Sequence, residues 1–85
     1  MEEKVIKLVL DYIKSTGIII NKDNVFIVWF CKTLQNWKAL VSTTLPDGMY
    51  YEVTYNGNNK EIYLDAYKKF ENRKIDDLKV ERLAN

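Results

Sequence analysis

A run of β-branched and aromatic residues from position 25 to about position 70 contains two turn signals, and it restricts the possible folds more than any other feature. The signals are Leu45-Pro46-Asp47-Gly48 and Asn56-Gly57-Asn58-Asn59. Proline fixes φ at a corner, glycine and asparagine tolerate positive φ, and β-branched and aromatic side chains suit a pleated surface. The run therefore predicts an antiparallel β-meander with strands at about residues 25–34, 37–44, 49–56 and 61–69.

The residues before this run have the three- and four-residue spacing of an amphipathic helix over about positions 2–16. Glu2 and Glu3 suit the positive end of the helix dipole, and Gly17 stands where a left-handed cap is expected. An extended apolar link and a polar turn connect this helix to the first strand. The chain is thus predicted to be one α+β domain, residues 1–85, in which the helix packs on the sheet. Residues 72–85 form either a short helix or a frayed tail.

Alternation along the strands divides the sheet into two faces. On the helix we expect Val5, Leu8, Val9, Tyr12 and Ile13 to point at the sheet. On the strands we expect the helix-facing residues to be Phe26, Val28, Phe30, Trp37, Ala39, Val41, Tyr51, Val53, Tyr55, Ile62 and Leu64. With Val28 in this core, Val28→Asp is expected to unfold the domain.

Two hairpin turns set the predicted register. A turn at Gln35-Asn36 would pair Leu34 with Trp37, Lys32 with Ala39 and Phe30 with Val41. A turn centred on Asn58-Asn59 would pair Tyr55 with Ile62, Val53 with Leu64 and Tyr51 with Ala66. A slip of one residue in the second hairpin would mix apolar and charged faces, so the second register is strongly specified.

The sheet face away from the helix is the candidate interaction surface. In the first strand the residues assigned to it are Val25, Ile27, Trp29, Cys31 and Thr33. The surface residues singled out are Trp29, Lys38, Tyr50, Glu52, Tyr63, Asp65 and Tyr67. Tyrosine and tryptophan are enriched at protein interfaces, and the same rings can stack on single-stranded bases. Glu52 and Asp65 are expected to be cross-strand neighbours. Such a pair can mark a cation or acid–base site, but an exposed pair neutralised by Lys38 or Lys68 is favoured.

Composition argues against several functional classes. The chain has no histidine, so the commonest general base and metal ligand is missing, and no catalytic, cofactor or metal site is predicted. The single cysteine, Cys31, cannot form an internal disulfide and is expected to be a small buried packing residue. The formal net charge of +1 is far from that of a dedicated nucleic-acid binder. No segment approaches a membrane span, and the expected location is the cytoplasm.

Much of the middle half of the chain is similar to a known family. The similar segments are Val28-Trp29-Phe30-Cys31-Lys32-Thr33-Leu34-Gln35-Asn36, Lys38-Ala39-Leu40, Ser42-Thr43-Thr44, the stretch 47–57, Ile62-Tyr63-Leu64-Asp65 and Tyr67-Lys68-Lys69. The chain resembles the small proteins of unknown function encoded by phages and prophages of Gram-positive bacteria. The resemblance implies a genomic setting and no mechanism.

These observations favour a non-enzymatic phage or prophage accessory protein that binds a host or phage protein through the aromatic face. Weak binding of single-stranded nucleic acid on the same face is the alternative. Self-association is a further expectation, since a symmetric dimer would cover Trp29 and Ile27. The remaining alternative is that the C-terminal segment covers this face, or that it is an ordinary tyrosine-rich surface without a partner.

Overall fold

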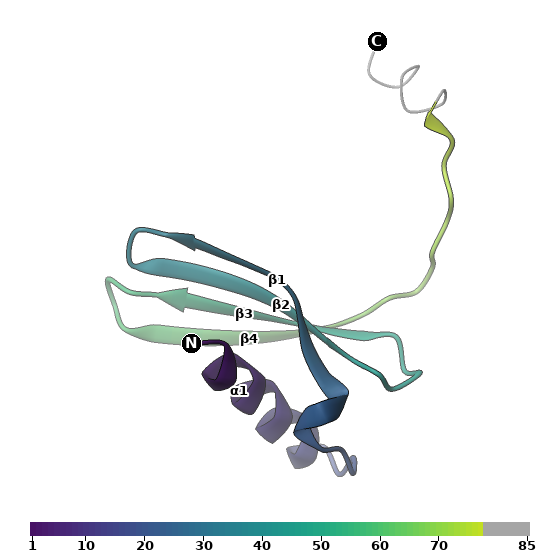
Figure 1. Ribbon diagram of the computed structural model, residues 1–85, viewed down its shortest axis with the longest axis horizontal. Helices are drawn as coiled ribbons and strands as arrows, with labels where there is room; N and C mark the ends of the chain where they lie inside the picture. The colour runs from purple at the N-terminus through teal and green to yellow at the C-terminus, as the bar shows by residue number, and fades with distance from the viewer. Residues whose placement is uncertain (78–85) are drawn as a thin grey trace.

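The computed structural model describes residues 1–77 and consists of one helix beside a four-stranded sheet (Figure 1). The elements are α1 (Glu2–Ser15), a 3-10 turn η1 (Lys22–Asn24), β1 (Val25–Thr33), β2 (Asn36–Thr43), β3 (Met49–Asn56) and β4 (Glu61–Lys68). All neighbouring strands are antiparallel, in the order β1-β2-β3-β4. The predicted α+β meander is confirmed. Residues 69–76 form neither helix nor strand, and the rest of the predicted tail, 78–85, lies outside the described residues.

The helix contributes one apolar stripe to the core. Val5, Val9 and Ile13 are buried, at the spacing of one residue per turn. The ring of Tyr12 is partly exposed and meets Tyr51 of β3 edge-to-face, with the ring centroids 5.9 Å apart. Gly17 ends the helix at φ +91°, a left-handed conformation that glycine adopts without strain, as the sequence predicts.

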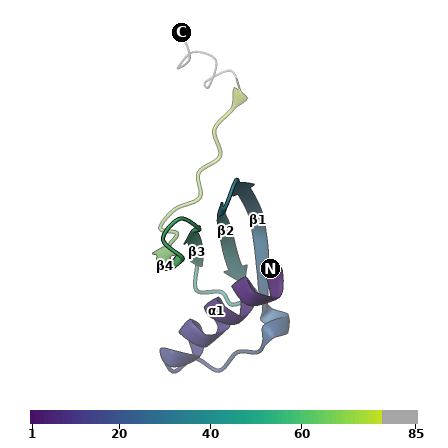
Figure 2. The same ribbon diagram turned by 90° about the vertical axis from the view of Figure 1, so that its left-hand side faces the viewer.

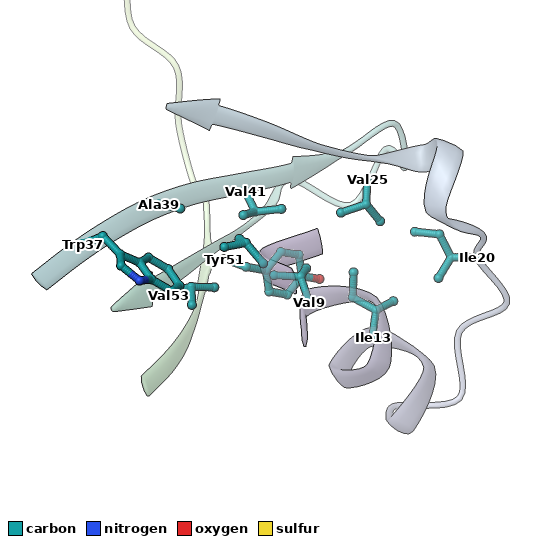
Figure 3. Close-up of a cluster of buried hydrophobic side chains, with 10 residues drawn as sticks. Val9, Ile13, Ile20, Val25, Trp37, Ala39, Val41, Tyr51 and Val53 are labelled. Carbon is teal, nitrogen blue, oxygen red and sulfur yellow. The ribbon is translucent and has the colours of Figure 1, made fainter. Parts of the chain in front are cut away.

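The core lies between α1 and the helix-facing side of β1, β2 and β3 (Figure 3). Its strand residues are Val25, Trp37, Ala39, Val41, Tyr51 and Val53. Ile20, from the link after the helix, also belongs to it, whereas its neighbour Ile19 is 98% exposed. The sequence does not show that Ile20 belongs to the core, because an apolar link of three residues has no period that indicates which one points inward.

In the first half of β1, a β-bulge exchanges the helix-facing and outward-facing residues predicted from the sequence. The register shifts between Ile27, which pairs with Val41, and Trp29, which pairs with Leu40, so Val28 is the extra residue. Val25 is therefore buried and Ile27 packs on the core, although both were predicted on the opposite face. Phe26 and Val28 were predicted in the core and are instead 45% and 46% exposed.

The turn of the first hairpin also differs from the prediction. Thr33 pairs with Asn36, so the two-residue turn is Leu34-Gln35, and Leu34 takes a positive φ of 57°. The predicted partners of Trp37, Ala39 and Val41 are therefore wrong: Lys32 faces Trp37 and Phe30 faces Ala39.

Two contacts account for this register. Phe30 lies beside the small Ala39, which lets its ring stack on Trp37 with centroids 5.6 Å apart. The Asn36 side chain accepts a hydrogen bond of 2.9 Å from the backbone N–H of Gly57 in the neighbouring β3–β4 turn. The first contact depends on the observed pairing of Phe30 with Ala39, and the second joins the two hairpin turns by a hydrogen bond.

The second hairpin has the predicted register throughout. Tyr55 pairs with Ile62, Val53 with Leu64 and Tyr51 with Ala66. Of the predicted core residues here, Ile62 is 38% exposed and Leu64 is half-buried, because α1 packs mainly on β1 and β2. Figure 2 shows the helix on one side of the sheet and the chain after β4 leading away from it.

Candidate interaction surface

The sheet face opposite α1, called the far face below, carries every residue singled out from the sequence. Directly paired residues project on the same side of a sheet. One row across the strands is Trp29, Leu40, Glu52 and Asp65; its neighbours are Cys31, Lys38, Thr54 and Tyr63, and then Phe26, Ser42, Tyr50 and Tyr67. The structure thus brings Trp29, Lys38, Tyr50, Glu52, Tyr63, Asp65 and Tyr67 together. It adds Phe26, which the bulge moves to this face.

The β1–β2 half of the far face carries its largest apolar side chains. Phe26 and Trp29 are both more than two-fifths exposed, and Leu40 lies beside Trp29. Cys31 is exposed here, so the expectation of a buried packing cysteine is wrong: no described element covers this side of β1. A shallow depression of about 320 Å³ is lined by residues that include Trp29, Cys31, Lys38 and Thr54.

The β3–β4 half combines tyrosines with carboxylates. Glu52 lies directly opposite Asp65, as predicted, and the Lys38 Nζ atom is 3.5 Å from the Glu52 Oε1 atom. Lys38 therefore offsets part of the repulsion between the two acids. Within residues 1–77, Asp65 forms no ion pair. The Lys69 ammonium lies 5.9 Å from the centre of the Tyr50 ring, within cation–π range.

At the end of this half, the Tyr63 hydroxyl donates a 2.6 Å hydrogen bond to the Glu61 carboxylate. This bond, together with the negative charge of Glu61, raises the pKa of Tyr63 above its usual value of 10.0. A second tyrosine, Tyr51, has a raised pKa mainly because it is buried in the core.

The Tyr63–Glu61 bond gives a pH-dependent prediction. We expect Glu61→Gln to lower the pKa of Tyr63 toward 10.0, because the carboxylate that opposes its ionisation is removed. In the parent chain the bond's contribution to stability is complete below the unfolded pKa of about 10 and is lost as pH rises through the higher folded pKa. Ring-carbon NMR titration resolves the individual tyrosines. An unchanged Tyr63 midpoint in the variant would contradict this explanation.

A second depression, of about 650 Å³, lies where α1 meets the start of β1. Ile6, Leu10 and Val25 supply apolar atoms, and the rim carries both signs of charge: Glu3, Lys7, Asp11, Lys14, Lys22 and Asp23. Lys7 and Asp11 are already paired at 3.2 Å. No pattern in the sequence indicates this groove, and its mixed rim favours neither anionic nor cationic ligands.

Residues 1–77 contain no group of three or more potential metal ligands. Among the same residues, every buried side-chain nitrogen and oxygen has a hydrogen-bond partner. No helix in this part of the chain has the length and apolar character needed to span a membrane.

Comparison with known proteins gives one match. The model of a family of unknown function, DUF6275, matches residues 2–77 and so covers α1 and the complete sheet. No curated protein and no solved structure matches the chain.

Proposed function

The chain belongs to the DUF6275 family, and on that premise we propose that it is a non-enzymatic accessory protein that binds another protein through the far face of its sheet. The proposal includes a phage or prophage origin, a cytoplasmic location and a host or phage protein as partner. The origin is supported by the resemblance of the middle of the chain to small phage and prophage proteins.

The observation that carries the proposal is the group of exposed rings on the far face. Phe26, Trp29, Tyr63 and Tyr67 are each 42% to 53% exposed. These rings lie on one face of the sheet, two on each of its edge strands, and exposed apolar and aromatic side chains that share one face mark interaction sites more often than scattered ones do. Aromatic residues also dominate the anchor positions of protein interfaces, because they bury a large area at small cost in conformational entropy.

The charges on this face favour a protein over nucleic acid. Glu52, Glu61 and Asp65 carry negative charge, and Lys38, which could contact phosphate, is engaged by Glu52. A face that binds single strands combines stacking rings with a positive groove. Weak nucleic-acid binding is the alternative outcome of the test.

The test uses three single substitutions and the exposed Cys31 thiol. In co-purification from a bacterial host, Trp29→Ala and Tyr63→Ala should each lose the partner, by analogy with interface anchors whose truncation costs about 2 kcal/mol or more. Ile19→Ala is the matched control, since Ile19 is 98% exposed and lies in the link before η1, outside the far face. Bound partner should also protect Cys31 from alkylation. A partner retained by both far-face variants would contradict the proposal.

Nucleic acid is tested separately. Fluorescence anisotropy with a labelled single-stranded oligonucleotide at two salt concentrations detects phosphate contacts, which weaken as salt rises. Salt-sensitive binding that Trp29→Ala abolishes would mean that the far face binds single-stranded nucleic acid instead of a protein. We expect no binding at low salt.

A further inference from the structure

The outer edge of β4 is open in the part of the chain that the structure describes. β4 is the last strand of the sheet, and all its residues except Leu64 are exposed. Its pairing with β3 is regular, whereas the other edge strand, β1, is interrupted by the bulge at Val28. A long regular edge strand presents unpaired backbone donors and acceptors to another strand.

Up to residue 77, the chain continues beyond β4 without covering this edge. The Lys69 N–H still donates to the Gly48 carbonyl at 2.8 Å, which extends the ladder by one residue. Because backbone groups alternate in direction along a strand, the odd-numbered residues of β4 face β3 and the even-numbered ones face outward. Residues 70–76 then lead away from the sheet (Figures 1 and 2). Phe70 is 94% exposed.

We propose that two copies of the chain pair through β4, antiparallel and about a twofold axis at Tyr67, with residues 69–73 extending each strand. This places Asp65 opposite Lys69 of the second copy, and Glu61 opposite Arg73 of the second copy. By symmetry each pair occurs twice. On the helix side of the sheet, Leu64 lies opposite Phe70 of the second copy, which would cover that ring. The proposal does not rest on the proposed function.

Charge complementarity selects this register over its neighbours. In a symmetric antiparallel pair, side chains on the same face can be matched only in steps of two residues. Moving the axis to Ala66 would set Glu61 against Glu71 and Leu64 against Lys68. Moving it to Lys68 would set that lysine against its own copy and Asp65 against Glu71. Of these three registers, only the one at Tyr67 sets acids opposite bases and avoids like charges directly opposite each other, which are destabilising.

The pairing also differs from the dimer expected from the sequence. That dimer would use Trp29 and Ile27, but Ile27 packs on the core. Pairing through β4 instead joins the two sheets into one of eight strands, since each contributes four. A twofold axis normal to the sheet keeps both far faces on the same side and leaves Trp29 of each copy open.

Charge exchange tests the register. Sedimentation equilibrium of the full chain should show a dimer, and Lys69→Asp or Asp65→Lys alone should raise its dissociation constant roughly tenfold or more, because each creates two like-charge pairs. The double variant Asp65→Lys/Lys69→Asp restores opposite charges and should recover the dimer. Lys68→Asp is the matched control: it makes the same charge change one residue away, opposite Ala66, and should leave the dimer within about threefold of the parent.

Three results would overturn the proposal: a monomeric parent chain at millimolar concentration, a double variant as weak as the single ones, or a Lys68→Asp effect equal to that of Lys69→Asp. All these positions are exposed, and circular dichroism melts of each variant verify that the domain is folded. If a variant keeps its melting transition but no longer dimerises, its substitution acts on the interface and not on the fold.

Discussion

Val41→Asp is expected to abolish cooperative folding, whereas Val28→Asp is expected to leave a folded domain. Val41 has no exposed surface and lies in β2, with β1 on one side and β3 on the other. A carboxylate there would be buried without a partner, at a cost comparable to the total stability of about 5–15 kcal/mol of a small domain. Val28 is the bulged residue of an edge strand and is nearly half exposed, so an aspartate there can reach water.

Circular dichroism melts and urea titrations of both variants distinguish these outcomes. The parent chain and Val28→Asp should each show one sigmoidal transition, and Val41→Asp should show none. If Val28→Asp also lost its transition, Val28 would be a core residue and the bulge assignment would be wrong. This pair of variants therefore tests the most consequential difference between the expected and observed strands.

That difference has a physical reason. Residues 25–30 are Val, Phe, Ile, Val, Trp and Phe, which are apolar at every position, so alternation alone does not indicate which set faces the helix. A bulge inserts one residue, so the residues before it point to the opposite faces from those expected. A strand that is apolar at every position shows no sign of this in its sequence. The turn at Leu34 was equally difficult to predict, because a leucine at positive φ is uncommon and Gln35-Asn36 has the more usual turn residues.

The second hairpin was predictable because its alternation is unambiguous. In β4, Glu61, Tyr63, Asp65 and Tyr67 alternate with Ile62, Leu64 and Ala66, so a shift of one residue would turn two acids toward the helix side. The Asn-Gly-Asn-Asn turn then supports the same register.

The candidate surface was found for a related reason. All seven of its residues lie after the bulge, where the predicted alternation of faces is correct, so each is predicted on the face where the structure has it. Phe26 lies before the bulge and was missed. The exposure of Cys31 was missed because it depends on what covers the face, and β-strand alternation carries no information about that. Ile62 points to the helix side and is still exposed for the same kind of reason, because α1 packs mainly on β1 and β2.

The second large effect is expected for Trp37→Ala. Trp37 is 5% exposed and is the middle ring of a three-ring stack on the helix side, with centroids 5.6 Å from Phe30 and 5.5 Å from Tyr55. These rings come from three adjacent strands, so Trp37 links β1, β2 and β3 at the end of the sheet near the two hairpin turns. Removing the indole leaves a cavity beside Ala39, whose methyl group is too small to fill it. We expect a loss of about 3–5 kcal/mol in the free energy of unfolding.

Trp29→Ala is the matched control, because it makes the same substitution on the far face of the adjacent strand. Trp29 is 42% exposed, and its loss should cost no more than about 1 kcal/mol. Urea titration followed by far-ultraviolet circular dichroism measures both variants without relying on tryptophan fluorescence, which each substitution alters. Equal losses for the two variants would mean that the far face is as densely covered as the core. A folded Trp29→Ala chain, by contrast, attributes any loss of partner binding to the surface itself, because its core stack is intact.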